Sequence, residues 1–287
     1  MSTYLSSKTV LDITRGMFRF CLAVVLLLWS GEAQAGQLAD RMAQFPNWES
    51  KPPVTAAQGD LIYPAWMEGT WNVTSTLVEQ VAPLAPEVVT PGFESNRRYL
   101  NQPVSFLVRF QAVTPQSSAI AENLVPLKLQ KSGRSPLPQP GKTTTVVADR
   151  EFNGLNIGKA YLGDRTIQSV KVDPNSPNRQ ITFLRTGRQL ISIVTGRAEE
   201  MPAPDRFIGT EVSNQIFRGI PQPYLNQVET TTAYQRQESP TLAIEADQVT
   251  AIYLSPQDAD YFKALERPVA LYRYRLELTP VDATSPS

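Results

Sequence analysis

Residues 69–79 read GTWNVTSTLVE, and this stretch decides the fold class. Apolar and polar side chains alternate along it, as they do in a strand with one buried face. Trp71, Val73 and Leu77 would lie on one face, and their immediate neighbours on the other. The stretch therefore predicts a long β-strand that starts at a glycine.

The same alternation recurs along most of the chain, as in residues 103–113. Further strands are expected at 143–152, 165–173, 180–186, 188–197, 206–217, 224–236, 242–254 and 270–279. Only residues 37–43, 153–162 and 257–265 are expected to hold short helices. Regular spacing with short connections predicts an antiparallel all-β fold, and we expect a closed or nearly closed barrel of roughly eight to ten strands. Closure would remove the exposed edges that a long open sheet leaves.

The N-terminus has the pattern of an export signal. Three basic side chains lie within residues 8–19, an apolar run covers residues 20–29, and residues 33–35 read AQA. Signal peptidase recognises small residues at such a site, and the apolar run is too short to span a bilayer comfortably. The sequence therefore predicts a cleaved signal peptide over residues 1–35 and an exported protein.

Removing residues 1–35 from the 287 of the chain leaves 252, which is enough for one large domain. Residues 36–66, with paired prolines and scattered aromatic side chains, are expected to form an extended N-terminal arm. Residues 67–280 would form a single β-barrel domain that contains a flexible, proline-rich insertion over residues 114–142. Residues 281–287 are expected to be a disordered tail.

Composition excludes several kinds of chemistry. The chain has no histidine, and its one cysteine, Cys21, lies in the predicted signal peptide. Ser-His-Asp and Cys-His nucleophile systems are therefore absent, and ordinary zinc and copper sites lose their main ligands. No glycine-rich phosphate loop follows an expected strand, so we expect no metal and no cofactor. Of the 27 basic and 27 acidic residues, three and two lie in the predicted signal peptide, which leaves a net charge of −1 and argues against a nucleic-acid partner.

Carboxylate or tyrosine chemistry remains possible. Asp247, Asp258 and Asp260 are candidates for paired carboxylates or a calcium contact, and a solvated turn is the alternative. Glu229, which three threonines follow, would face a polar barrel interior or form a cross-strand charge pair.

Residues 69–71 place a Gly-x-Trp at the start of the first long strand. This placement resembles the lipocalin and calycin pattern, in which the tryptophan closes one end of the barrel beneath an arginine of the last strand. The resemblance implies that Trp71 is buried and that Arg273 or Arg275 stacks on its indole ring. Closure of an up-and-down barrel would also make the first and last strands neighbours.

Aromatic side chains gather near this end of the expected barrel. They would form a structural plug or, alternatively, the mouth of a ligand site. The candidate ligand-binding or barrel-closing residues are Tyr63, Trp66, Trp71, Tyr272, Arg273, Tyr274 and Arg275.

A broader resemblance covers nearly the whole predicted mature chain. It rests on FPNW (45–48), GDLIYP (59–64), GTWNVTSTL (69–77), PGF (91–93), FNGLN (152–156) and QITFL (180–184). These stretches resemble an uncharacterised family of exported cyanobacterial proteins and chloroplast thylakoid-lumen proteins. The resemblance implies an oxygenic phototroph and an address in the thylakoid lumen or the periplasm, and it assigns no catalytic residue.

Three functions are compatible with these observations. We expect a non-enzymatic barrel protein that binds a small apolar ligand, such as a pigment, quinone or lipid. The alternative is an accessory or assembly factor that contacts a photosynthetic membrane complex, because loops on a rigid scaffold often carry contacts. A lumenal enzyme that works through carboxylates or tyrosines is the third. We expect no integral membrane segment after signal cleavage.

Overall fold

The computed structural model describes residues 36–114, 144–185, 187–221, 223–239 and 242–281. The predicted signal peptide and nearly all of the predicted insertion and tail lie outside the described residues. Among the residues described, no helix combines the length and the apolar composition that crossing a bilayer requires.

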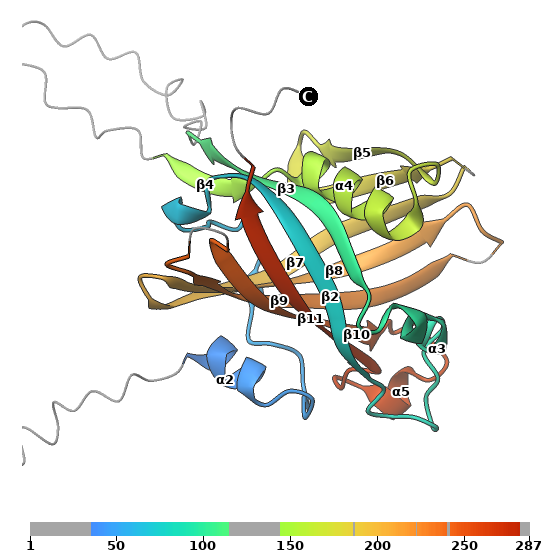
Figure 1. Ribbon diagram of the computed structural model, residues 1–287. Coiled ribbons are helices and arrows are strands. Elements are labelled where there is room, and N and C mark those ends of the chain that lie inside the picture. The colour runs from blue at the N-terminus through green and yellow to red at the C-terminus, as the bar shows by residue number, and fades with distance from the viewer. Residues whose placement is uncertain (1–35, 115–143, 186, 222, 240–241, 282–287) are drawn as a thin grey trace, which may run out of the picture. The chain divides into compact units, whose positions relative to one another are not determined.

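The described residues form eleven strands in one sheet, whose pairings are antiparallel (Figure 1). Ten strands follow one another in the order β4-β3-β2-β11-β10-β9-β8-β7-β6-β5, and the short β1 pairs with β7. The strands are β1 Thr55–Ala56, β2 Gly69–Val81, β3 Pro103–Val113, β4 Thr145–Ala148, β5 Ile167–Asp173, β6 Ser176–Leu184, β7 Gln189–Ala203, β8 Arg206–Arg218, β9 Tyr224–Arg236, β10 Ile244–Leu254 and β11 Ala270–Pro280. The helices are α2 Gln37–Ala43, α3 Phe93–Asn96, α4 Arg150–Leu162 and α5 Tyr261–Ala264, with the 3₁₀ turns η1 Ala65–Met67 and η2 Arg97–Tyr99.

The predicted antiparallel all-β fold is confirmed, and most strands lie within a few residues of their predicted bounds. The strand predicted over residues 143–152 is wrong in its second half, because β4 has four residues and α4 follows directly. Asp149 explains the switch. Its side chain accepts a hydrogen bond from the backbone N–H of Phe152 over 3.1 Å and so caps the first turn of α4.

The sheet curls into a half-barrel, and the predicted closed barrel is not confirmed. β2 and β11 are neighbours as predicted, with Trp71 opposite Pro280. However, this pair lies inside the sheet, and the ends of the strand order are β4 and β5. In the described part of the chain β4 does not pair with β5, so the sheet keeps two edges.

Helix α4 lies between β5 and the part of β3 that β4 leaves uncovered (Figure 1), because β4 pairs only with residues 110–113 of β3. The side-chain amide of Asn153 accepts a hydrogen bond from the backbone N–H of Arg109 in β3 over 2.6 Å and donates one to its carbonyl over 3.1 Å. On the other edge, the Glu151 carboxylate accepts a hydrogen bond from the backbone N–H of Val172 in β5 over 2.8 Å. Side chains of α4 thus bond the backbone of both edges, as a further strand would.

Two glycines let α4 approach the second edge closely. A Cβ atom at Gly154 would lie 2.9 Å from the side chain of Gln180 and 3.1 Å from that of Val170. A Cβ atom at Gly158 would lie 3.2 Å from the side chain of Ile167. Larger residues at these positions would therefore push the helix away from β5 and β6.

The two faces of the sheet are covered differently. We call the face toward α4 the inner face and the face that carries α2 the outer face. On the outer face, Met42 of α2 and the nearby Trp48 pack against Val249, Tyr253 and Leu271 of β10 and β11. The segment predicted as an extended arm therefore includes a docked helix, whose bounds are the predicted ones.

A buried ion pair fixes α2 to the outer face. The Arg41 guanidinium donates to both carboxylate oxygens of Glu229 over 2.8 Å, and Glu229 is fully buried. The hydroxyls of Tyr253 and Thr231 donate to the same carboxylate over 2.6 and 2.8 Å. Glu229 is therefore paired with a helix, and neither a polar interior nor a cross-strand ion pair describes its position.

We expect Gly154→Val to destabilise the protein by about 1–3 kcal/mol, because the added side chain must displace Gln180 and Val170. Helix propensity works in the opposite direction, since valine is a better helix former than glycine. Urea denaturation of this variant and of Lys159→Val, a control on the same helix, measures the effect. A free energy of unfolding equal to that of the wild type would contradict close packing of α4.

Candidate functional site

A cavity of about 310 Å³ lies between the inner face of the sheet and α4. The helix contributes Asn153, Ile157 and Tyr161, which are four residues apart and therefore share one side of the helix. The adjacent side carries Gly154 and Gly158 against β5 and β6. The helix that bridges the two edges thus also forms one wall of the cavity.

The cavity lining is apolar with a few uncharged polar groups. Its apolar part includes Val73, Phe106, Val108, Phe110, Leu276 and Leu278. Among the described residues, no Asp, Glu, Lys or Arg lines it. The hydroxyls of Ser75 and Tyr161 are hydrogen-bonded over 3.0 Å, and Gln248 accepts a hydrogen bond from Thr232 over 3.2 Å.

Two tyrosine hydroxyls beside the cavity have no partner within the described part of the protein. They belong to Tyr63 and Tyr274. Burial is the main cause that raises the pKa of both hydroxyls, and burial also raises the pKa of Tyr234 in the same wall to about 12. All three side chains therefore stay protonated at neutral pH and offer hydrogen-bond donors.

The partly buried charges near Tyr63 are paired with one another. Arg150, at the start of α4, lies 3.0 Å from the carboxylate of Asp60 and 2.7 Å from that of Glu211. Arg197 lies 2.8 Å from the same Glu211 carboxylate. Two acidic groups do converge here, as the enzyme alternative requires, but both are bound by guanidinium groups.

This arrangement lies within a recognisable sequence family. A model of a domain of unknown function, DUF6816, matches residues 55–282. The chain belongs to the DUF6816 family. The matched region runs from β1 through β11, so it includes α4 and every residue that lines the cavity, whereas α2 precedes it. No curated protein and no solved structure matches the chain.

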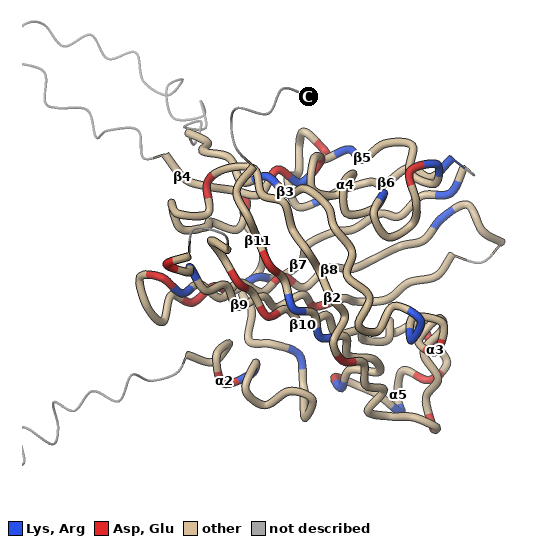
Figure 2. The backbone as a smooth tube through the Cα atoms, viewed as in Figure 1, with Lys and Arg blue, Asp and Glu red and all other residues tan. Residues whose placement is uncertain are grey.

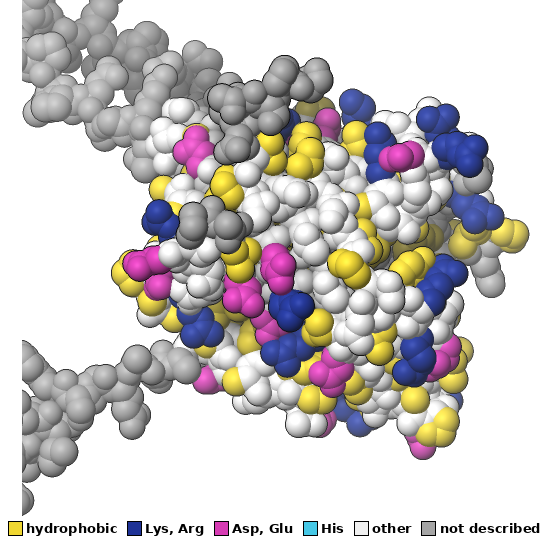
Figure 3. All heavy atoms as spheres, viewed as in Figure 1, with side chains coloured by type: hydrophobic (Ala, Val, Ile, Leu, Met, Phe, Trp, Pro, Cys, Tyr) yellow, Lys and Arg dark blue, Asp and Glu magenta, His cyan; other side chains and the backbone are white. Residues whose placement is uncertain are grey.

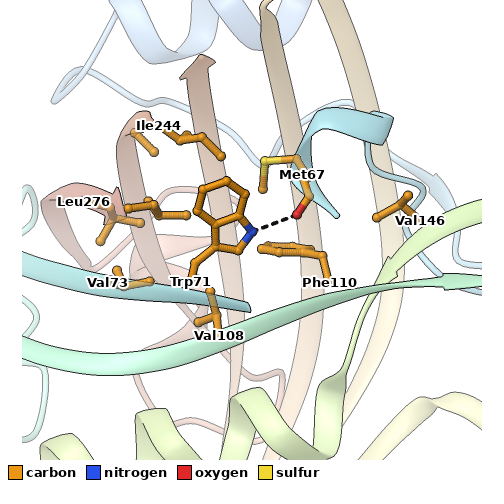
Figure 4. Close-up of a cluster of buried hydrophobic side chains, with 10 residues drawn as sticks. Met67, Trp71, Val73, Val108, Phe110, Val146, Ile244 and Leu276 are labelled. Carbon is orange, nitrogen blue, oxygen red and sulfur yellow. Dashed lines mark hydrogen bonds between the residues drawn. The ribbon is translucent and has the colours of Figure 1, made fainter. Parts of the chain in front are cut away.

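Trp71 is buried in the DUF6816 domain, as predicted (Figure 4). Its indole N–H donates to the carbonyl of Met67 over 2.8 Å, and its ring lies among Phe110, Val108 and Leu276. These last three side chains also line the cavity. Trp71 is therefore the end wall behind the cavity, which fits a structural plug.

The predicted stacking of an arginine on Trp71 is wrong. Antiparallel pairing brings the start of β2 to the end of β11, and Arg273 lies opposite Glu79 near the other end of β2. Arg273 belongs to the outer face, where it forms an ion pair with Asp247 over 2.6 Å and its guanidinium lies over the ring of Phe45. Arg275 lies 3.5 Å from the carboxylate of Glu277.

The structure brings only some of the other candidate residues to the cavity. Tyr63 and Tyr274 line it directly. Trp66 packs behind it against the cluster that holds Trp71. Tyr272 lies farther along β11, where its hydroxyl accepts a hydrogen bond from Asn96 over 3.3 Å.

Sequence reasoning missed the contribution of α4. Asn153, Ile157 and Tyr161 recur at the spacing of one helix face within residues 153–162, where a short helix was predicted. That spacing was the available signal, because a helix inside a β-domain must pack one of its faces against the sheet.

The remaining carboxylates form no open acidic site. The backbone N–H of Asp260 donates to Asp258 over 2.9 Å, and Lys263 pairs with Asp260 over 2.6 Å, which fits the turn alternative. Asp247 is paired with Arg273. Among the described residues there is no group of three or more His, Cys, Asp or Glu side chains that could hold a metal ion. Figure 2 shows acidic and basic residues interspersed along the sheet.

Trp71→Ala should lower the free energy of unfolding by about 3–5 kcal/mol, because it removes a large buried side chain from a packed cluster. Trp66→Ala should cost less, since Trp66 is only partly buried. Urea denaturation of both variants measures the difference. A smaller loss for Trp71→Ala than for Trp66→Ala would contradict the role of Trp71 as the end wall.

Stability should fall as the pH rises from 10 to 12. A tyrosine of the unfolded chain ionises near pH 10.0, whereas Tyr234 in the folded protein keeps its proton to about pH 12. Ionisation therefore favours unfolding in this window, by up to about 1.4 kcal/mol per pH unit for each such tyrosine. Chemical denaturation across the window should show a shallower decline for Tyr234→Phe. Equal slopes for the variant and the wild type would speak against this assignment.

Proposed function

We propose that this protein is a non-enzymatic binding protein for a small and mainly apolar molecule, whose uncharged part is held in the cavity between the inner face of the sheet and α4. The observation that carries the proposal is the cavity itself, which has apolar walls and, among the described residues, no charged side chain in its lining. Moving an unpaired charge into such a site would be costly, so a neutral group is favoured there. The proposal keeps the location that the sequence predicts, the thylakoid lumen or the periplasm.

The size of the cavity narrows the ligand. About 310 Å³ is at the small end of the roughly 300–1,000 Å³ that is typical of small-molecule sites. A single ring, such as a quinone head, or part of a lipid chain suits this volume better than a whole pigment molecule. The hydroxyls of Tyr63 and Tyr274, which have no partner among the described residues, would donate to oxygen acceptors on the bound molecule.

Binding can be tested with one blocking variant and a matched control. Thr250 of β10 lines the cavity, and Thr76 of β2 is paired with Arg275, whose side chain belongs to the outer face. The purified protein, Thr250→Trp and Thr76→Trp are each incubated with a total lipid and pigment extract, repurified and examined by mass spectrometry. We expect a bound species in the wild type and in Thr76→Trp, and its loss in Thr250→Trp. Recovery of an empty wild-type protein from repeated incubations would contradict the proposal.

A second candidate is an accessory factor that contacts a photosynthetic membrane complex through its surface. Three large apolar side chains favour it, because Val89, Phe262 and Leu265 are 78%, 82% and 53% exposed. Their neighbours Val88 and Ala264 pack in one cluster, so the three belong to the same end of the domain. Figure 3 shows apolar side chains at the corner where α3 and α5 lie. An empty cavity in the extract experiment would favour this candidate over ligand binding.

A further inference from the structure

We infer that the ligand is a single-chain lipid acid whose carboxylate lies at Arg98 and whose chain runs past Tyr161 and Tyr274 into the inner cavity. This inference rests on the proposed function and commits it to one ligand class. It starts from a second cavity of about 290 Å³. The two cavities share Tyr161 and Tyr274 in their linings, so they adjoin at these two side chains.

The lining of the second cavity combines apolar and polar side chains. Leu77, Val104 and Leu162 supply apolar walls, and Asn96, Arg98 and Gln102 supply polar groups. The first cavity, by contrast, has no charged side chain in the described part of its lining. From the second cavity to the first, the lining thus changes from charged to uncharged, which is the order of groups along a lipid acid.

Arg98 is available to bind an anion. Within the part of the chain that the structure describes, no carboxylate lies within ion-pair distance of its guanidinium, which donates to the hydroxyl of Tyr99 over 2.9 Å and lies 4.8 Å from the centre of that ring. The preceding residue differs, because Arg97 donates to both carboxylate oxygens of Glu94 over 3.1 and 3.2 Å. The remaining N–H groups of Arg98 can bind a carboxylate in the bidentate geometry that guanidinium groups favour.

The two shared tyrosines differ in how they are held. The Tyr161 hydroxyl is bonded to Ser75 over 3.0 Å, and its ring packs against Phe106. The Tyr274 hydroxyl has no partner among the described residues. Among the described residues, the Tyr274 hydroxyl is therefore the unbonded donor where the two cavities adjoin.

The experiment compares lauric acid with lauryl alcohol, which differ in the head group alone. Isothermal titration calorimetry, below the concentration at which either ligand aggregates, measures the dissociation constants for the wild type, Arg98→Gln, Arg98→Lys and Arg97→Gln. We expect the wild type to bind the acid about three- to ten-fold more tightly than the alcohol, as for an ion pair near the surface. Arg98→Gln should lose this preference, Arg98→Lys should keep part of it, and Arg97→Gln should keep all of it.

Thr250→Trp separates this inference from the proposed function. It should weaken both ligands, because the chain would no longer fit into the inner cavity. Equal binding of acid and alcohol by the wild type, lost in Thr250→Trp, would overturn the inference and support the proposed function. Binding of neither ligand would also overturn the inference. The proposed function would then be tested by the extract experiment alone. A preference for the acid that survives in Arg98→Gln would overturn the assignment of the head group to Arg98.

Discussion

The open edges of the curled sheet are the constraint on which the rest of the structure depends. An unpaired edge carries a row of backbone N–H and C=O groups that need partners and that invite another strand. Helix α4 takes the place of a strand, since Asn153 bonds the backbone of β3 and Glu151 bonds that of β5. A helix with its side chains is about 10 Å wide, whereas neighbouring strands are about 4.8 Å apart. The helix therefore cannot lie flat in the sheet, and the cavity is the space left between its Asn153–Tyr161 side and the inner face.

The outer face of the sheet is covered by packed side chains. There, Met42 of α2 and Trp48 pack on β10 and β11, and Arg41 completes the hydrogen bonds of the buried Glu229 in β9. A buried charge without a partner would be strongly destabilising, so the ion pair ties the helix to one position on the strands. Strands β10 and β11 present Thr250 and Tyr274 to the cavity on their inner face. A firmly covered outer face thus supports a rigid wall for an inner face that stays open.

The sequence predicts features that depend on near neighbours and misses those that depend on distant partners. Alternation identifies β2 and the other long strands, and the burial of Trp71 follows from its place in that alternation. Register does not follow from alternation, which is why Arg273 was wrongly placed against Trp71. The bridging role of α4 could not be predicted either, because Asn153 bonds a residue 44 positions away in the chain. For the same reason the partner of Glu229 could not be predicted, since it is an arginine 188 positions away. Of the candidate site, Tyr63 and Tyr274 were found, whereas the helix wall was not.

The described lining of the cavity contains no charged side chain, and this limits the chemistry that the cavity can support. Among the described residues, its titratable lining groups are Tyr63, Tyr161, Tyr234 and Tyr274, and burial raises the pKa of each. The chain has no histidine, which is the side chain that ordinarily titrates near neutral pH. The protonation state of the lining therefore stays constant from mildly acidic to mildly alkaline solution. General acid–base catalysis needs a group whose pKa is near the working pH, and none of the described lining groups meets this condition. A constant set of neutral donors suits retention of a ligand, and any response to pH would have to come from the ligand or from charges outside the inner cavity.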